Sequence, residues 1–398
     1  MNVLFINQFY PPDVAPTGCY LHDVARELTM RGHYVTVVCS RRNYDGGISY
    51  VREHALDGVR VLRVAACGFG RRSFVGKLLD YVTFYVAAGW ALATVRCGEE
   101  GGPRGGGKPD IVVALSTPPL IGVLARLAAW LRRCRHAHWI MDVYPDVLAA
   151  HGLLVRGGWL YRAIDWLARR ELQGSALVLT LGPSMARRLV SKLSAPVEWV
   201  PLWSTVPLAS VPERAGSGTL LMYSGNMGLG HRIGDLLEAA ERLSPSKQVA
   251  WLFVGGGRRR VQVEAWKAAH PNANVGLQRY APAEELASHL QRADVHLVSL
   301  AASWQGCMVP SKIQNIFASG RPAVFVGGVD NELARWIKEA DAGWVVAEGN
   351  VDGLLQAIEA ACEPAVRRSK GLAARRFAAA HFDPVENIAR VCALIEKA

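Results

Sequence analysis

A lysine that could bind an anion follows a buried strand near the C-terminal end of the sequence. The apolar run Val295–Leu300 is typical of a strand, and Pro310, Ser311 and Lys312 come after it. Apolar residues then recur at helical spacing, and a proline in the first helical turn removes only an N–H that had no partner. The remaining free N–H groups and the helix dipole attract anions. The stretch 306–322 therefore predicts a helix that starts at Pro310 and binds an anion beside Lys312.

A glycine-rich turn follows an earlier apolar run that we predict to be a strand. Gly225 and Asn226 open this turn, and His231 and Arg232 close it at the start of an expected helix. Glycines let backbone N–H groups approach a phosphate, and the two closing side chains add charge or hydrogen bonds. A tight turn without a ligand explains the same residues equally well.

A second glycine-rich turn, over residues 253–260, ends in three arginines. We expect Gly256 and Arg258 to contact a diphosphate, although most such arginine runs are solvated. Arg279 and Tyr280 open the loop after the next strand and are candidates for contact with a base. A plain surface loop is the alternative for these two residues.

The first half of the chain carries candidate residues at the ends of two predicted strands. Asp142 ends one of them, and Tyr144 follows it closely. A carboxylate there can act as a base or bind substrate hydroxyls, or it can cap the following turn. Thr17 and Gly18 end a proline-rich loop after the first strand, where a substrate could come close to the backbone.

Several chemistries lack their motifs in this sequence. We find no Asp-x-Asp pair with metal-chelating spacing, no His-x-x-x-His, no Gly-x-Ser-x-Gly and no Gly-x-x-x-x-Gly-Lys-Ser/Thr. Metal chemistry, serine hydrolysis and P-loop hydrolysis are therefore disfavoured, and we expect neither a metal nor a cofactor.

These residues need elements to position them, and the chain repeats a strand–helix rhythm typical of open α/β sheets. Ligands bind such sheets at the carboxyl ends of the strands. The predicted strands cover residues 3–6, 34–38, 111–115, 139–142, 177–180, 220–223, 249–254, 275–277, 295–300, 323–326 and 344–346, and a final helix covers about 373–397.

At 398 residues the chain is long enough for two domains. We predict an N-terminal domain over 1–203, a linker over 204–218 and a C-terminal domain over 219–375. For the remaining residues, 376–398, we predict a C-terminal helix.

Composition bounds the partners and the compartment. The chain is 51% apolar and 20% charged, which indicates a globular protein. The net charge is +11, and residues 1–203 hold 24 Lys and Arg against 15 Asp and Glu, or +9. This basic half suits an anionic partner or a solvated surface, and no aromatic-basic motif supports nucleic acid. The eight cysteines form no Cys-x-x-Cys pair, and the start of the chain does not resemble a signal peptide, so we expect a reducing cytoplasm.

The segment 71–90 combines basic residues with an apolar and aromatic run. It suits a helix that lies in an anionic membrane interface, or an ordinary helix packed on the sheet. We therefore expect a cytoplasmic protein that can bind the inner face of the membrane. The sequence contains no uninterrupted apolar stretch of about 20 residues, so we expect no membrane-spanning helix.

The order of these motifs resembles glycosyltransferase family 4 over nearly the whole chain. The matching motifs are Gln8-Phe-Tyr-Pro-Pro12, Thr17-Gly18, Arg31-Gly-His-Tyr-Val-Thr-Val-Val38, Ser224-Gly-Asn-Met-Gly228, Val254-Gly-Gly-Gly257 and Ala318-Ser-Gly-Arg-Pro322. The turns Ser116-Thr-Pro-Pro119, Asp142-Val-Tyr-Pro145 and Val309-Pro-Ser-Lys312 are similar to those of amino-sugar (N-acetyl-fucosaminyl-type) transferases of bacterial surface-polysaccharide synthesis.

The resemblance implies a GT-B fold, in which two Rossmann-like domains face each other across a cleft and the C-terminal helix, over 376–398, returns to the first domain. It implies a metal-independent, retaining transfer from a UDP-sugar to a hydroxyl of a lipid-linked or glycan acceptor. Lys312 and Arg232 would then stabilise the departing diphosphate, and Asn315 would bind the ribose. Thr17, Asp142 and Tyr144 would bind the acceptor, and Gly18 would lie against the transferred sugar.

Some positions depart from the family pattern. Many members carry two glutamates where this chain has Cys307 and Asn315. An arginine and a lysine of the first glycine turn are replaced by Asn226 and His231, and a histidine is replaced by Met141. Two rivals therefore stay open: a non-catalytic partner subunit with the same fold, and a UDP-sugar 2-epimerase.

Overall fold

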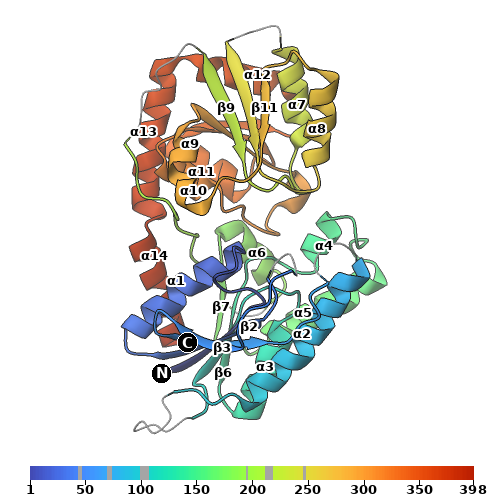
Figure 1. Cartoon of the computed structure of the whole chain (residues 1–398), viewed down its shortest axis with the longest axis vertical. Coiled ribbons are helices and arrows are strands. Elements are labelled where there is room, and N and C mark those ends of the chain that lie inside the picture. Colours follow the sequence, from blue (N-terminus) through green and yellow to red (C-terminus); the bar gives the residue numbers. More distant parts are fainter. Residues whose placement is uncertain (44–46, 70–73, 99–106, 194–195, 211–217, 245–247) are drawn as a thin grey trace. The chain divides into compact units, whose positions relative to one another are not determined.

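The computed structural model describes residues 1–43, 47–69, 74–98, 107–193, 196–210, 218–244 and 248–398. The chain divides into two compact units, each an α/β layer structure (Figure 1). Unit 1 comprises Met1–Ala149, Leu154–Val200 and Ile388–Ala398, and unit 2 comprises Ala150–Leu153 and Pro201–Asn387. Parts of the predicted linker (211–217), of the glycine-rich segment (99–106) and of the predicted interfacial segment (71–73) lie outside the described residues.

Within the described residues, unit 1 holds a sheet of eight strands in the order β3-β4-β2-β1-β5-β6-β7-β8. Every pair is parallel except β3 with β4. The strands are β1 Asn2–Ile6, β2 Tyr34–Ser40, β3 Glu53–Leu56, β4 Val59–Val64, β5 Ile111–Ala114, β6 Arg135–Trp139, β7 Leu177–Thr180 and β8 Glu198–Trp199. The strand order reverses between β1 and β5, so the loops after these two strands open a ligand-binding crevice.

Helices cover this sheet through a continuous apolar core. Phe84 and Leu92 of α2 and Ala125 of α3 pack with Leu4 and Val112 of the strands, all fully buried. At the other end of the chain, Glu396 of α14 accepts hydrogen bonds from His33 and Arg31, so residues 388–398 belong to this unit. The helices are α1 Pro16–Met30, α2 Phe74–Thr94, α3 Gly122–Arg132, α4 Asp146–Ala150, α5 Trp159–Leu172, α6 Pro183–Val190 and α14 Pro384–Lys397.

The described part of unit 2 holds a parallel sheet of six strands in the order β11-β10-β9-β12-β13-β14. The strands are β9 Thr219–Ser224, β10 Val249–Val254, β11 Val275–Gln278, β12 Val295–Leu300, β13 Ala323–Gly327 and β14 Gly343–Ala347. Its helices are α7 Ile233–Arg242, α8 Arg260–Ala269, η1 Ala283–Glu285, α9 Leu286–Gln291, η2 Ala302–Trp304, α10 Ile313–Ala318, α11 Glu332–Ala340, α12 Val351–Cys362 and α13 Pro364–His381. The order reverses between β9 and β12, which places the segments after them at the ligand-binding edge.

The predicted strand at residues 139–142 is wrong. Strand β6 ends at Trp139, where the prediction begins, and it includes His136 and His138. The two imidazole rings pack edge to face inside the unit, with their centres 5.5 Å apart. The strand therefore contains polar residues, whereas the prediction placed it in the apolar run that begins at Trp139. Asp142 consequently lies in the loop beyond the strand, still at its carboxyl end.

Two predicted helix limits also differ from the structure. Helix α10 begins at Ile313, not at Pro310, because its first backbone hydrogen bond runs from Ile316 N to Lys312 O. With only six residues it carries a weak dipole, so charge at this point comes mainly from Lys312. The predicted final helix is two helices, because Pro384 begins α14 and Asp383 accepts a hydrogen bond from Glu386 N at its start.

The turns after β9 and β10 interlock through main-chain contacts. Met227 N donates to Gly256 O at 2.7 Å, and Arg259 N donates to Met227 O at 2.9 Å. A Cβ on Gly255 would lie 2.2 Å from Gly225 O, and its φ of +127° is one that other residues rarely adopt. Only glycine fits at this contact, so the two turns form one backbone surface.

Gly255→Ala tests this close approach. The strained φ alone costs on the order of 1–3 kcal/mol, and the clash with Gly225 O adds to it. Gly349→Ala is the control, since Gly349 has a φ of +78° but nothing within 4 Å of an added Cβ. We expect urea unfolding to show a clearly larger loss of free energy of unfolding for Gly255→Ala, and equal losses would contradict the interlock.

Candidate functional site

Lys312 lies against the first glycine turn of unit 2. Its Nζ donates to the Tyr223 hydroxyl at 2.7 Å and to Asn226 O at 3.3 Å. It also sits 4.1 Å from the centre of the Tyr223 ring, and its Cε would touch a Cβ on Gly225 at 2.7 Å. The segment after β12 thus delivers a cation to the turn after β9, which is the reversal point of the sheet.

Burial lowers the pKa of Lys312 to about 7. Within the described residues, the hydrogen-bond partners of its Nζ are the Tyr223 phenol and the Asn226 carbonyl oxygen, and neither is a carboxylate. An incoming anion would supply the missing countercharge and raise the pKa again. This lysine is therefore suited to bind a phosphate group and take up a proton with it.

His231 lies beside this lysine but is buried and uncharged. Its Nδ1 is hydrogen-bonded to Ser299 O, and its ring meets that of Tyr223 edge to face at 5.8 Å. Burial first, and the nearby Lys312 second, lower the pKa of His231 to about 3. It orders the turn and supplies no positive charge at neutral pH.

Arg232 is tied to a carboxylate in this structure. Its Nε and Nη2 donate to Asp235 at 3.0 and 2.8 Å, and this hydrogen bonding raises the pKa of the arginine. Asp235 also accepts from Gly349 N at 2.9 Å. Arg232 can bind an anion only if its guanidinium also keeps, or gives up, its hydrogen bonds to Asp235. Lys312, in contrast, already contacts the first glycine turn.

The three arginines of the second turn differ in their surroundings. Arg259 donates to Leu229 O at 3.1 Å, and Arg260 donates to Gln278 O at 2.8 Å, so both hold main chain. Arg258 is exposed, and no hydrogen bond or ion pair holds it within the described residues. Of the three, Arg258 is the one whose guanidinium is left available to a ligand.

Tyr280 forms one wall over the interlocked turns. Added Cβ atoms on Gly255 and Gly256 would each lie 3.1 Å from its ring, and the side chain is 58% exposed. Arg279, next to it, is exposed as well. An exposed aromatic ring above a glycine floor is a surface on which a planar base can stack.

The predicted residues around α10 lie near Lys312 in sequence, with varied surroundings. Pro310 is buried, Ser311 is half-buried, and both precede the helix. Asn315 Oδ1 accepts from Thr205 N at 2.8 Å, and its Nδ2 donates to Thr205 Oγ1 at 2.9 Å. Asn315 therefore holds the segment around Thr205 in this structure, and its ribose role stays a prediction.

In unit 1, Thr17 and Gly18 lie in the first turn of α1 and not in a loop as predicted. Thr17 Oγ1 accepts from Asn7 Nδ2 at 3.3 Å. A Cβ on Gly18 would lie 2.8 Å from Phe9 O, so the backbone that approaches this glycine is the chain's own. The loop after β1 is thereby packed onto the start of α1.

Asp142 lies in the loop after β6, beside the segment after β5. Ser116 Oγ accepts from the backbone N–H groups of Met141 and Asp142 at 3.0 and 3.1 Å and so joins the two loops. Burial raises the pKa of Asp142 to about 6, and within the described residues no hydrogen bond reaches its carboxyl group. This carboxyl group can accept a hydrogen bond or a proton from a substrate hydroxyl.

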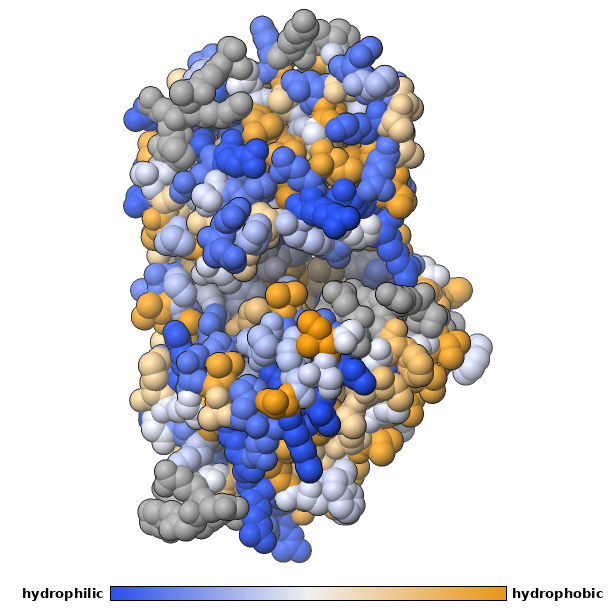
Figure 2. Space-filling view, in the orientation of Figure 1, coloured by the Kyte–Doolittle hydropathy of each residue, from blue (hydrophilic) through white to orange (hydrophobic). Residues whose placement is uncertain are grey.

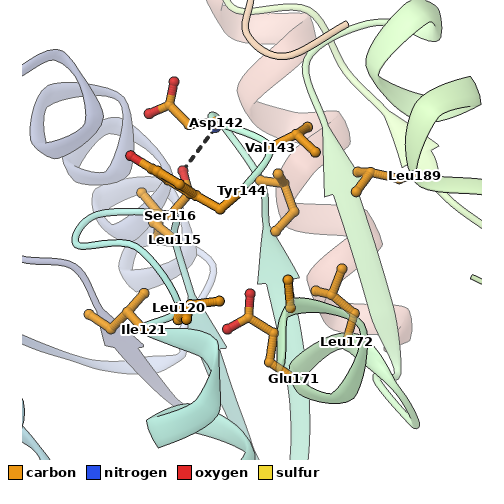
Figure 3. A pocket seen from close by; sticks show the side chains of 12 residues that line it. Leu115, Ser116, Leu120, Ile121, Asp142, Val143, Tyr144, Glu171, Leu172 and Leu189 are labelled. Atoms are coloured by element: carbon orange, nitrogen blue, oxygen red, sulfur yellow. Dashed lines mark hydrogen bonds between the residues drawn. The ribbon is translucent and has the colours of Figure 1, made fainter. Parts of the chain in front are cut away.

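A small pocket lies beneath this loop (Figure 3). Its volume of about 20 Å³ holds roughly one water molecule. Tyr144 and Glu171 are among the residues that line it, and Figure 3 shows the Glu171 carboxyl group directed into it while the Asp142 carboxyl group points away. The pocket is too small for a sugar, so Asp142 and Tyr144 would meet a substrate from outside it.

Sequence reasoning missed three side chains that shape these sites. Tyr223 holds Lys312, Ser116 joins the loops of unit 1, and Glu171 lies buried with its pKa raised to about 8. Tyr223 ends a predicted strand and Ser116 opens the turn Ser116-Thr-Pro-Pro119, but a single strand tyrosine or loop serine has no spacing signal. Glu171 belongs to an amphipathic helix, where only the fold shows that a carboxyl group faces inward.

Within the described residues, no group of three or more His, Cys, Asp and Glu side chains is placed to hold a metal ion. No described helix combines the length and apolar character needed to cross a membrane.

Two family models match consecutive parts of the chain. A glycosyl transferase 4-like domain matches residues 17–203, and a glycosyl transferases group 1 domain matches residues 218–363. The chain belongs to the glycosyltransferases. Its two α/β units with largely parallel sheets have the architecture of GT-B glycosyltransferase structures, as predicted.

Individual relatives agree with this assignment. WcaI of Escherichia coli (strain K12), whose name gives it a role as a colanic acid biosynthesis glycosyl transferase, is 25% identical over 361 residues, covering 84% of this chain and 85% of WcaI. The crystal structure of WaaG, a glycosyltransferase involved in lipopolysaccharide biosynthesis, has a TM-score of 0.68 with 16% identity over 99% of both chains. Anabaena HepE in complex with UDP-glucose has a TM-score of 0.67 with 13% identity over 100% of this chain and 99% of that one.

The titration of Lys312 predicts how this glycosyltransferase binds a nucleotide sugar. We expect the protonated lysine to bind the diphosphate of a nucleotide sugar, so the affinity for UDP-glucose should fall as the pH rises above about 7, by at most tenfold per pH unit. UDP-glucose is the probe because its diphosphate has no ionisation near neutral pH. Calorimetry in buffers of different ionisation enthalpy should also show proton uptake on binding.

Matched variants separate Lys312 from other titrating groups. Lys312→Met should bind weakly with no pH slope between about pH 6 and 8.5. Lys267→Met, at an exposed lysine of α8, should keep the slope. A slope that survives in Lys312→Met would show that another group is responsible.

Proposed function

We propose that this glycosyltransferase moves an N-acetylated hexose from a UDP-sugar to a hydroxyl of a lipid-linked or glycan acceptor, with retention of the anomeric configuration. We further propose that it needs no metal and no cofactor. The observation that carries the donor assignment is the Lys312 ammonium group, held against the interlocked glycine turns at the reversal point of the unit 2 sheet.

In this reaction negative charge develops on the diphosphate, which would lie beside the Lys312 ammonium group of unit 2. The acceptor oxygen bonds to C1 of the sugar, the bond from C1 to the diphosphate breaks, and the acceptor proton passes to the departing UDP or to solvent. Lys312 stabilises the charge that develops on the diphosphate. Arg232 joins it when it releases Asp235, and Arg258 is a second candidate because it is exposed.

The rest of the donor has counterparts in the same unit. The base stacks on Tyr280 beside Arg279, and the diphosphate lies along the backbone of Gly225, Asn226 and Gly256. Asn315 reaches the ribose through the part of its amide that Thr205 does not use. Pro310 and Ser311 keep Lys312 outside the helix and so free to point at the turn.

Unit 1 binds the acceptor in this proposal. Asp142 has a carboxyl group without a hydrogen-bond partner among the described residues, and burial raises its pKa to about 6. Such a group accepts a hydrogen bond from a sugar hydroxyl at neutral pH. Tyr144 and Thr17 complete the acceptor contacts, and Gly18 contributes by packing the loop after β1 onto the start of α1, beside which the transferred sugar would lie.

The relatives support a place in bacterial surface-polysaccharide synthesis. WcaI is named for colanic acid biosynthesis, WaaG acts in lipopolysaccharide biosynthesis, and HepE was solved with UDP-glucose.

One observation favours a second candidate, a non-catalytic partner subunit. Cys307 is buried and Asn315 is uncharged at the positions where many family members carry glutamates. A subunit of this kind would bind a nucleotide sugar without releasing UDP.

The deciding assay follows UDP release from a panel of UDP-sugars, with lipid-linked and free glycan acceptors and with EDTA present. We expect acceptor-dependent release with an N-acetylated donor, and an NMR spectrum of the product with the anomeric configuration of the donor. Lys312→Ala should lower kcat by about 100- to 1000-fold, as does loss of one charge-stabilising donor elsewhere.

The control is Lys267→Ala, which removes an exposed lysine of α8. Binding without any release for every pair would favour the partner subunit, and a changed sugar on the nucleotide would favour an epimerase. Normal turnover by Lys312→Ala would contradict the role given to this lysine.

A further inference from the structure

A cluster of polar side chains lies inside unit 1, next to the pocket beneath the Asp142 loop. Glu171 of α5 and His136 and His138 of β6 are all buried. Figure 2 shows polar and apolar residues mixed on the surface of this unit, and the cluster lies below that surface. Burying a polar group costs free energy unless the group is hydrogen-bonded, so these side chains need partners.

Glu171 and His138 come together at the start of α3. A Cβ added to Gly122 would lie 2.6 Å from His138 Nδ1 and 2.9 Å from Glu171 Oε2, so both atoms lie against this glycine. Both atoms are buried, and neither makes a hydrogen bond within the part of the chain that the structure describes. The carboxyl group and the imidazole are therefore neighbours, and each has a polar atom left to satisfy.

Both groups are uncharged at neutral pH. Burial raises the pKa of Glu171 to about 8, against a weaker opposing effect of the Val123 and Gly122 N–H groups. Burial also lowers the pKa of His138 to about 3. A neutral carboxyl group has one O–H to donate and an oxygen to accept, and a neutral imidazole has one nitrogen that accepts. Glu171 can thus donate to His138 and still accept a hydrogen bond from the pocket.

Ser116 lines the same pocket and has a hydroxyl proton to donate. Its Oγ accepts from Met141 N and Asp142 N at 3.0 and 3.1 Å, which occupies both acceptor positions of the hydroxyl oxygen. Among the described residues, no acceptor is recorded for the hydroxyl proton itself. In Figure 3 the Glu171 carboxyl group points into the pocket, with Ser116 and the Asp142 loop above it in this view.

The pocket has room for one water molecule that could join these groups. Its volume is about 20 Å³, and one water needs roughly 10–15 Å³ of such space. Leu115, Ile140 and Leu189 give it walls that are largely apolar, while Ser116 and Glu171 bring polar groups to it. Buried water molecules occupy sites of this kind, where polar groups otherwise lack partners.

We propose that Glu171 is a positioning residue for the Asp142 loop and acts through one water molecule bound in this pocket. The water accepts the Ser116 hydroxyl proton and donates to the Glu171 carboxyl group. Glu171 Oε2 in turn donates its proton to His138 Nδ1. The Ser116 hydroxyl, Glu171 Oε2 and His138 Nδ1 then all have partners, and Ser116 is fixed where it accepts from the two N–H groups of the loop. No proton is transferred, because every member of the chain is neutral.

This inference deepens the proposed function and rests on it, since the loop matters to the reaction only if Asp142 binds the acceptor. The water is observed without donor or acceptor, whereas UDP release measures the transfer itself. A chain that releases no UDP would overturn the proposed function and leave the water in place. A missing water in an active enzyme would overturn only the inference.

The direct test is a crystal structure of the full chain at a resolution that shows ordered water. We expect one water within hydrogen-bond distance of both Ser116 Oγ and a Glu171 carboxyl oxygen, and Glu171 Oε2 within hydrogen-bond distance of His138 Nδ1. A pocket without water, or a water that contacts neither Ser116 nor Glu171, would overturn the proposal.

Steady-state kinetics tests the positioning role, with the acceptor and the UDP-sugar varied separately. Glu171→Leu removes the group that binds the water, so we expect KM for the acceptor to rise by about tenfold while KM for the UDP-sugar stays within about twofold. Glu171→Gln should bring the acceptor KM back, because an amide accepts through its oxygen and donates through its N–H groups. An acceptor KM that Glu171→Leu leaves unchanged, or that Glu171→Gln raises as much as Glu171→Leu, would contradict this role.

A double-mutant cycle shows whether Ser116 and Glu171 act through the same water. Ser116→Ala with Glu171→Leu should raise the acceptor KM no further than Ser116→Ala alone, and effects that multiply would contradict the shared water. Leu172→Ala is the matched control, because this buried leucine of α5 lines the pocket without a polar group and should leave the acceptor KM unchanged. Circular dichroism checks the folding of each variant, and if Glu171→Leu does not fold, the crystal structure decides.

Discussion

The proposed donor site of this glycosyltransferase depends on a backbone contact that no side chain could occupy. Gly255 approaches Gly225 O so closely that an added Cβ would lie at 2.2 Å, and Met227 and Gly256 are joined by a hydrogen bond beside it. The two turns thereby form one surface of main chain at the carboxyl ends of β9 and β10. Main-chain N–H groups at such a surface can bind phosphate without the loss of conformational entropy that ordering a flexible side chain would require. Everything else in the site is arranged around that floor, with Tyr280 above it and Lys312 at its edge.

Lys312 is the cation that the described residues hold against the first glycine turn, while Arg258 and Arg279 are exposed. His231 is buried and neutral, Arg232 is held by Asp235, and Arg259 and Arg260 hold main-chain carbonyls. Burial lowers the pKa of Lys312 to about 7. Its described partners, the Tyr223 phenol and the Asn226 carbonyl, are not carboxylates and so do not offset this effect. A cation that is poorly solvated before binding gains most when an anion arrives. For this physical reason we expect a chain with Cys307 and Asn315 in place of glutamates still to bind a diphosphate.

Much of the fold could be predicted from the sequence because buried parallel strands are apolar runs. Strands such as β10 and β12 match their predicted bounds, and the glycine turns after β9 and β10 were found from composition alone. The predicted bounds of β6 are wrong because two histidines occupy this strand, which is therefore not a plain apolar run. The predicted start of α10 is too early because a proline is compatible with a first helical turn but does not impose one. The partners of the site residues could not be predicted. Nothing local to Arg232 or Asn315 shows that Asp235 and Thr205 hold them, since those contacts depend on the loops that the fold brings together.

We expect the diphosphate of a nucleotide sugar to replace the Tyr223 phenol and the Asn226 carbonyl as the principal partner of Lys312 Nζ. A crystal structure of the full chain with bound UDP tests this most directly. We expect a phosphate oxygen at about 3 Å from Lys312 Nζ, main-chain N–H groups of the two glycine turns on the same phosphates, and the uracil ring against Tyr280. UDP bound elsewhere, with Lys312 still held only by Tyr223 and Asn226, would contradict it.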